Sequence, residues 1–146
     1  MEEKLFEFKL LTGKREAFSS YVRCVILPGE NGEFGVLSNH LNLISNLTFG
    51  LVKIKKPIMS AIDLVDSIKD ENDFDEMYCI SESGIAHFFE DKLVVTVDYA
   101  IKVFGDDNNG ESEEATYKKT NLNNEEQDFY NLSQEYMNKI NTNKFK

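Results

Sequence analysis

Hydrophobic and polar residues alternate in short runs between positions 4 and 104, which predicts a chain built mainly of β-strands. Phe6, Phe8 and Leu10 alternate with Glu7 and Lys9, so three apolar side chains share one face of a strand. The further predicted strands cover residues 17–19, 21–27, 34–37, 51–55, 77–81, 85–90 and 93–100. Residues 28–32 and Ser38-Asn39 carry turn-forming side chains between them. Short strands with frequent turns are typical of a β-sandwich or barrel, and we predict a sandwich of about ten strands over residues 1–104.

Residues 57–76 break this rhythm and are predicted to be an insertion in the sandwich. After Pro57 the apolar residues fall at helical spacing, and Ser60 is a suitable helix cap. The apolar positions are Ile58, Ala61, Ile62, Val65 and Ile68. A short amphipathic helix and an extended hairpin both fit so short a pattern.

The C-terminal region changes to a helical period. Residues 105–122 read as a polar linker, with a short helix in its second half as an open alternative. From residue 123 the apolar residues recur every three or four positions, which predicts a helix over about 123–141 within a tail of 123–146. Its apolar stripe is expected to pack on the sandwich or on a partner, and consists of Phe129, Leu132, Tyr136 and Ile140. The predicted fold is therefore mainly β with an α tail.

Charge narrows the classes of partner. The chain has 146 residues and a formal net charge of −10, which argues against nucleic acid because phosphate binding needs a basic surface. The excess acid lies in residues 57–76 and 105–146, whereas the rest of the chain is balanced. We therefore expect the sandwich to recognise partners by shape and apolar contact. The N-terminus lacks the pattern of a signal or transit peptide, so a bacterial cytoplasmic location is the simplest expectation.

The sequence shows no arrangement that predicts catalysis, a metal site or a cofactor. A phosphate-binding loop, a Gly-rich dinucleotide loop, CxxC and HExxH are all absent from it. Cys24 and Cys79 lie in separate apolar runs and are expected to be buried free thiols. His87 alternates with Ile85 and Phe89, which predicts a histidine at the edge of the core.

The most informative segment, residues 27–50, carries a recognisable motif. It begins Leu27-Pro-Gly-Glu-Asn-Gly-Glu-Phe-Gly-Val-Leu-Ser-Asn-His40. This segment resembles the signature of the epsilon subunits of F-type ATP synthases (called delta in mitochondria), which reads Leu-Pro-Gly-x-x-Gly-x-Phe/Leu-Gly-Val/Ile-Leu-Pro-Gly-His. Residues 6–12, 15–18 and 92–100 resemble other family segments in the right order, so the resemblance covers about residues 4–104 apart from the insertion.

The resemblance implies a non-catalytic central-stalk subunit that needs no cofactor and couples rotation to ATP synthesis. Its partners would be the gamma subunit and the membrane rotor ring, so its contact with the bacterial inner membrane would be peripheral, on the cytoplasmic side and through the ring. A role in regulating hydrolysis stays open. The matching contact positions are Gly32, Glu33, Phe34, Gly35, Ser38, Asn39 and His40.

The sequence also departs from the family pattern. Ser38-Asn39 replaces Pro-Gly, Thr48-Phe49-Gly50 keeps only the Gly of a later Pro-Gly, and 57–76 exceeds the usual hairpin link. The family has two C-terminal helices, and this tail predicts one strong helix. Two alternatives stay open: an unrelated adaptor sandwich, and an enzyme whose site assembles from distant carboxylates.

The tail is not expected to bind ATP. Family members that do so carry a motif resembling Ile/Leu-Asp-x-x-Arg-Ala, and this tail has no arginine after Gly105. Arginine binds phosphate with a planar fork that lysine lacks, and Glu111, Glu113 and Glu114 would repel a triphosphate. Calorimetry with millimolar ATP should therefore detect no saturable binding, and a saturable isotherm would contradict this expectation.

Overall fold

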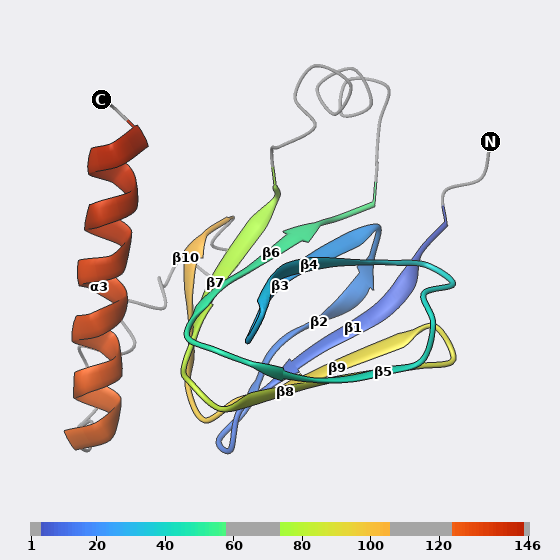
Figure 1. Cartoon of the computed structure of the whole chain (residues 1–146), viewed down its shortest axis with the longest axis horizontal. Helices are drawn as coiled ribbons and strands as arrows, with labels where there is room; N and C mark the ends of the chain where they lie inside the picture. The colour runs from blue at the N-terminus through green and yellow to red at the C-terminus, as the bar shows by residue number, and fades with distance from the viewer. Residues whose placement is uncertain (1–3, 58–73, 106–123, 145–146) are drawn as a thin grey trace.

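The computed structural model describes residues 4–57, 74–105 and 124–144. This part forms ten strands and a C-terminal helix that stands beside β10 (Figure 1). The strands are β1 (Phe6–Leu11), β2 (Glu16–Val22), β3 (Cys24–Gly29), β4 (Gly32–Leu37), β5 (Leu43–Leu47), β6 (Gly50–Lys55), β7 (Glu76–Ile80), β8 (Gly84–Phe89), β9 (Lys92–Thr96) and β10 (Ala100–Phe104), and the helix is α3 (Asn124–Lys144). No helix in these three ranges is long and apolar enough to cross a membrane.

The strands form one hydrogen-bonded sheet that folds into two layers. Its order is β10-β7-β6-β3-β5-β8-β9-β1-β2, with β4 paired to β3 off this path. β1 and β9 pair in parallel, and the other pairs are antiparallel. β3 and β5 meet only at Gly29 and Leu47, so this corner joins the half containing β3, β6, β7 and β10 to the half containing β5, β8, β9, β1 and β2.

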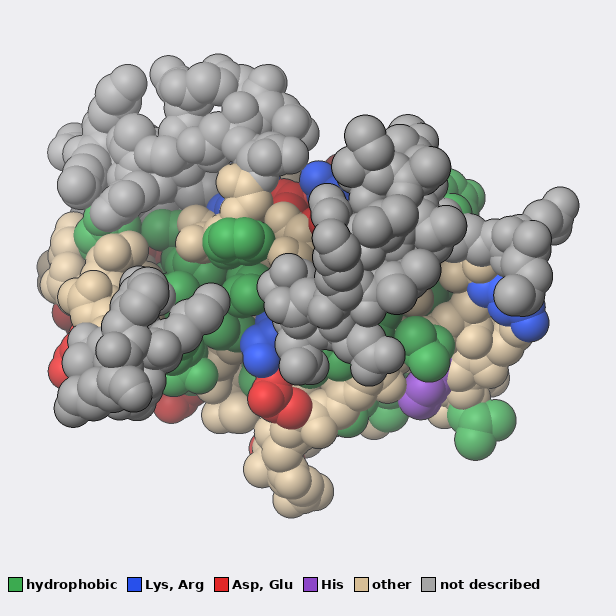
Figure 2. Space-filling model, turned by 90° about the horizontal axis from the view of Figure 1, so that it is seen from above, with side chains coloured by type: hydrophobic (Ala, Val, Ile, Leu, Met, Phe, Trp, Pro, Cys, Tyr) green, Lys and Arg blue, Asp and Glu red, His purple; other side chains and the backbone are tan. Residues whose placement is uncertain are grey.

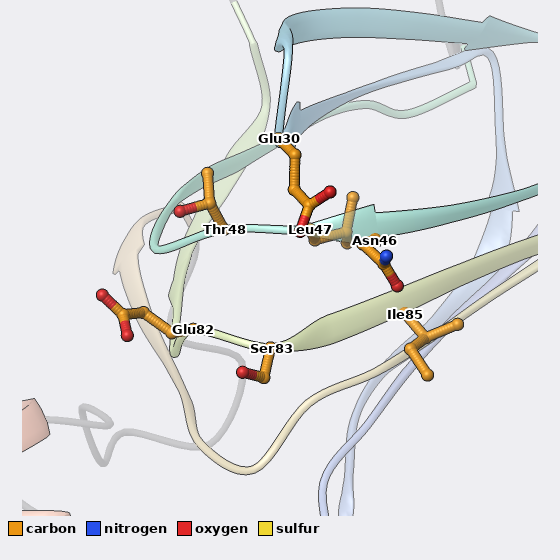
Figure 3. Close-up of a pocket in the computed structure, with 7 residues that line it drawn as sticks. All are labelled: Glu30, Asn46, Leu47, Thr48, Glu82, Ser83 and Ile85. Atoms are coloured by element: carbon orange, nitrogen blue, oxygen red, sulfur yellow. The ribbon is translucent and has the colours of Figure 1, made fainter.

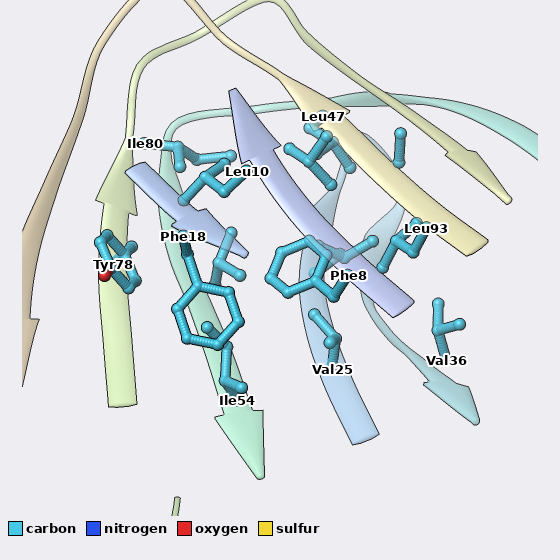
Figure 4. Packing of buried hydrophobic residues seen from close by; sticks show 14 of the residues in the cluster. Phe8, Leu10, Phe18, Val25, Val36, Leu47, Ile54, Tyr78, Ile80 and Leu93 are labelled. Atoms are coloured by element: carbon cyan, nitrogen blue, oxygen red, sulfur yellow. The ribbon is translucent and has the colours of Figure 1, made fainter. Parts of the chain in front are cut away.

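The core lies between the inner faces of the two halves. β1 alternates between buried Phe6, Phe8 and Leu10 and half-buried residues, as its sequence pattern predicted. Phe8 packs against Phe18, which makes an edge contact with Tyr78 across the core (Figure 4). Each such aromatic side chain contributes roughly 1.5–3 kcal/mol by leaving water. The Tyr78 hydroxyl donates a hydrogen bond to the Ala17 carbonyl, so its polar end is also satisfied.

The predicted fold class is confirmed, whereas several strand boundaries differ. The predicted strand 21–27 is interrupted at Arg23, and 93–100 is β9 followed by a bend and the start of β10. Pro28 and Gly29 belong to β3, so the turn before β4 is only Glu30-Asn31. β5 was not predicted as a strand.

Most of the predicted insertion and linker lie outside the described residues, which omit 58–73 and 106–123. The last residue of the predicted insertion, Glu76, is however part of β7 and pairs with Ile54 of β6.

Glu76 is buried where β6, β7 and β10 end together. One carboxylate oxygen lies 2.6 Å from the Lys56 ammonium and the other 2.6 Å from that of Lys102. Gly105, with φ of 133°, closes over this cluster, because a Cβ atom there would lie 2.5 Å from the Glu76 Cγ. The cluster therefore fixes three strand ends with one buried charge.

Replacing Glu76 by Gln should lower the free energy of unfolding by about 3 kcal/mol, because two ammonium groups would then face a neutral amide. Urea unfolding followed by circular dichroism measures this loss. Glu16→Gln is the matched control, since that exposed carboxylate lies 4.0 Å from Lys9 and should change stability by less than about 0.5 kcal/mol. Equal losses in the two variants would contradict the proposed anchoring by Glu76.

Candidate interaction site

The signature residues form a hairpin at the margin of the sandwich. β3 and β4 pair in six register positions from Cys24 with Leu37 to Gly29 with Gly32. Gly32 has φ of 121°, a conformation that residues with a Cβ atom rarely adopt. At Gly29 the need is for space, because a Cβ atom would lie 2.9 Å from both the Gly32 carbonyl oxygen and the Phe34 ring. We call residues 28–34 the signature turn.

Glu33 lies in the first residues of β4 and His40 lies beyond the other end of this strand, although the sequence suggested one surface around both. Glu33 is exposed in the signature turn and pairs with Lys53 of β6 at 3.2 Å. His40 is half-buried, and its ring makes an edge contact with the core residue Phe88. Its Nδ1 atom lies 2.7 Å from the Leu41 carbonyl oxygen. His40 is thus partly a packing residue, which the sequence had suggested for His87.

The remaining signature positions shape these two ends. Phe34 is half-buried and packs against the core, and Gly35 stands 3.2 Å (from its ideal Cβ position) from the Ile26 side chain. Ser38 is half-buried, whereas Asn39 is exposed with φ of 66°. The Asn39 amide donates a 2.7 Å hydrogen bond to the Asp91 carboxylate, which ties the β4–β5 loop to the β8–β9 turn.

The outer face of β5 and β8 exposes large apolar side chains. Ile44 is 75% exposed, Ile85 49% and Phe89 48%. Ile44 pairs with His87 in the β5–β8 register, so these side chains share one face. His87 is exposed between Ile85 and Phe89, and its predicted place at the core edge is wrong, because Ala86 and Phe88 point inward instead. We call Ile44, Ile85, His87 and Phe89 the apolar outer patch. On another face of the molecule, seen from above in Figure 2, hydrophobic side chains also reach the surface among polar ones.

The opposite outer face, on β6, β7 and β10, is covered by α3. The face that receives the helix consists of Leu51, Met77, Cys79, Ile101 and Val103. Phe129, Tyr136 and Ile140 of the predicted stripe pack there, together with Tyr130 and Met137. Leu132 does not, because it is 46% exposed. The buried helix face is centred one residue later, on fully buried Ser133, whose hydroxyl donates to the Tyr130 carbonyl.

Phe49, in the β5–β6 turn, is the central aromatic contact of the helix. Its ring centroid lies 5.3 Å from that of Tyr136 and 6.3 Å from that of Phe129, both in edge-to-face geometry. Phe129 also stacks on Tyr99 at 5.8 Å. Such pairs contribute about 0.5–1.5 kcal/mol each beyond burial.

The first turn of α3 is held by polar contacts. Buried Glu126 pairs with Lys14 from the β1–β2 turn, and the Tyr99 hydroxyl donates a 3.0 Å hydrogen bond to Glu125. Acidic side chains are also favourable at this positive end of the helix dipole. The helix therefore contacts the β1–β2, β5–β6 and β9–β10 turns at once.

A cavity of about 530 Å³ lies between the β3–β4, β5–β6 and β7–β8 turns at this end of the sandwich (Figure 3). It is lined by Glu30, Asn46, Leu47, Thr48, Glu82, Ser83 and Ile85. Within the described ranges no three His, Cys, Asp or Glu side chains gather in a way that could hold a metal ion.

The two cysteines are free thiols, as expected, but they differ in accessibility. Cys79 is fully buried beneath α3, and burial raises the pKa of its thiol to about 12. Cys24 is half-buried, and burial raises its pKa while Lys55 and Arg23 act in the opposite direction. Burial, followed by the charges of Cys79 and Glu33, likewise raises the pKa of the Tyr136 phenol.

Comparison with known proteins places these features in a family context. Residues 5–103 match the family model described as ATP synthase, Delta/Epsilon chain, beta-sandwich domain. The ATP synthase epsilon chain of Campylobacter curvus is 36% identical over 105 residues, which cover 72% of this chain and 67% of that protein. The epsilon chain of Campylobacter jejuni (strain 81116) is 31% identical over 103 residues, 70% of this chain and 68% of that protein.

Solved structures agree in fold at low sequence identity. A chain of the Euglena gracilis mitochondrial ATP synthase, from the OSCP/F1/c-ring structure, matches with a TM-score of 0.52 and 16% identity over 70% of this chain and 55% of that one. A chain of the Tetrahymena thermophila mitochondrial ATP synthase central stalk and c-ring structure gives a TM-score of 0.51 and 10% identity, with full coverage of both chains.

Thiol labelling at pH 8 should modify Cys24 at least tenfold faster than Cys79, because the reactive thiolate of Cys79 is suppressed by burial and its raised pKa. Mass spectrometry of peptides after timed labelling measures both rates. In guanidinium chloride the two rates should converge, which serves as the control. Equal rates in the native protein would show that α3 does not protect Cys79.

Proposed function

This chain belongs to the ATP synthase delta/epsilon family, and from this premise we propose that it is a non-catalytic central-stalk subunit of a bacterial F-type ATP synthase. It docks on the gamma subunit and on the membrane rotor ring, so that rotation driven by proton flow is coupled to ATP synthesis. Its place is at the cytoplasmic side of the inner membrane, which it meets through the ring.

The apolar outer patch is the observation that carries this proposal. α3 covers one outer face of the sandwich, whereas Ile44, Ile85 and Phe89 expose apolar surface on the other. Large apolar side chains that share one exposed face of a well-packed domain are suited to contact with a protein partner. We assign this face to the gamma subunit, with Leu41, 83% exposed beside it in the β4–β5 loop, extending the contact.

The signature turn is the proposed contact with the rotor ring. Glu33 is exposed at the end of the sandwich where several turns gather, away from the loop that holds His40. His40 and Asn39 then belong to the gamma side, where they support the loop that carries Leu41. The seven signature positions thus divide between two partners along the length of β4.

Stiffness is the property that this role requires. The two halves enclose a continuous core of fully buried side chains, and interiors packed at such density deform little under load. Paired strands connect the two proposed contacts, because β4 pairs with β3 along its whole length. A displacement applied at the signature turn is therefore passed to the gamma face without a cofactor or a chemical step.

Glu33→Lys should weaken binding of the chain to the isolated rotor ring by about 1–3 kcal/mol if the turn lies near the centre of the contact. Leu41→Asp should weaken gamma binding by a similar amount without disturbing the fold, since Leu41 is almost fully exposed. Biolayer interferometry with purified gamma subunit and purified ring measures both.

Glu16→Lys on β2, an equally simple charge reversal outside both proposed contacts, is the control and should leave both affinities unchanged. Wild-type affinities for Glu33→Lys and Leu41→Asp, with circular dichroism unchanged, would show that the interfaces are elsewhere.

A further inference from the structure

The signature turn and α3 form two walls of one cavity of about 490 Å³. Gly32 and Glu33 line it from the turn, and Tyr136 and Ile140 line it from the helix. The charge of Glu33 contributes to the raised pKa of the Tyr136 phenol, which is consistent with this proximity. A surface proposed for partner contact and the covering helix are therefore neighbours.

The β5–β6 turn connects these two walls through close contacts. The Thr48 amide donates a 2.9 Å hydrogen bond to the Pro28 carbonyl at the base of the signature turn. Next to it, a Cβ atom on Gly50 would lie 2.8 Å from the Pro28 Cβ, so the Gly50 backbone packs directly against the Pro28 ring. Between them, Phe49 presents its ring to Phe129 and Tyr136 of the helix.

We propose that docking of α3 on the sandwich and engagement of the signature turn by its partner are energetically linked through Phe49, each favouring the other. The partner in this statement rests on the proposed function, whereas the link between turn and helix rests on contacts within the chain. The device is regulatory: it makes the state of the helix depend on whether the stalk contact is made.

The linkage is expected to be positive because the docked helix orders the signature turn. A docked helix holds Phe49, which holds Thr48 and Gly50 against Pro28 and so restricts the signature turn. A partner that binds an already ordered turn loses less conformational entropy, so it binds more tightly. Because linkage is reciprocal, the bound partner must stabilise helix docking by the same factor.

Cys79 provides a reporter for helix docking, since it is buried beneath α3. In a Cys24→Ser background it is the only thiol in the chain, and its labelling rate measures how often the helix leaves the sheet. Gly29→Ala, which forces the turn apart, should raise this rate about fivefold or more. Gly13→Ala is the matched control, because nothing lies within 4 Å of a Cβ atom there.

The Phe49→Leu variant tests whether the signature turn and α3 are linked through Phe49. In that variant the helix keeps an apolar contact but loses the aromatic pair, so adding Gly29→Ala should change the Cys79 rate less than twofold. Should Gly29→Ala fail to fold, Gly32→Ala perturbs the same turn through its φ of 121° alone. The proposal is overturned if the turn variants match Gly13→Ala, or if their effect persists undiminished with Phe49→Leu.

Purified rotor ring is the probe that tests whether a bound partner stabilises helix docking. At saturating ring, Cys79 labelling in the Cys24→Ser protein should slow about fivefold or more, and in Phe49→Leu it should slow less than twofold. A ring that binds without slowing the label, or that accelerates it, overturns the linkage. A ring that does not bind at all contradicts the proposed function instead, and the turn variants then remain the test of the internal link.

Discussion

The structure depends on a close backbone approach between the β3–β4 and β5–β6 turns. Gly50 contacts Pro28, the Thr48 amide bonds the Pro28 carbonyl, and Gly29 pairs with Leu47. This is the corner at which one sheet becomes two layers. A Cβ atom at Gly50 would lie 2.8 Å from the Pro28 side chain and would push the two turns apart. A Cβ atom at Gly29 would instead lie 2.9 Å from the Gly32 carbonyl oxygen and the Phe34 ring, within its own hairpin. The Leu-Pro-Gly and Thr-Phe-Gly segments are thus explained by packing, before any partner is considered.

The two outer faces of the sandwich differ in exposure because α3 covers only one of them. The face of β6, β7 and β10 buries Leu51, Cys79 and Ile101 under α3, whereas the face of β5 and β8 leaves its apolar residues exposed. Most of the acidic excess lies in the 57–76 segment and the tail. The sandwich itself is nearly neutral, so the recognition proposed at the exposed face would rest on shape and desolvation.

The sequence predicted what period and turn chemistry determine, and it failed where both faces of a strand are apolar. Alternation in β1 identified Phe6, Phe8 and Leu10 as core residues. In β8 one face carries Ile85, His87 and Phe89 and the other carries Ala86 and Phe88, so both faces are apolar or aromatic. The sequence therefore did not determine which face is buried, and His87 was assigned to the wrong one. The prediction that Leu132 packs on the sandwich was wrong for a related reason, because the apolar face of a helix is broad and its centre is not fixed by the sequence. The small side chain of Ser133 lets the helix approach the sheet there, and Leu132 stays exposed.

The candidate site also depends on contacts between residues that are far apart in the sequence, and a local sequence pattern does not predict such contacts. Glu33 was selected by the signature, but its pairing with Lys53 of β6 follows from the fold. An ion pair between side chains this exposed is worth at most about 1 kcal/mol. The Glu33–Lys53 pair can therefore open at little cost, which the docking role proposed for Glu33 requires. Buried Glu76, held by two lysines, has no such freedom. A glutamate is thus an exposed surface charge where it pairs with Lys53, and a buried anchor where it pairs with Lys56 and Lys102.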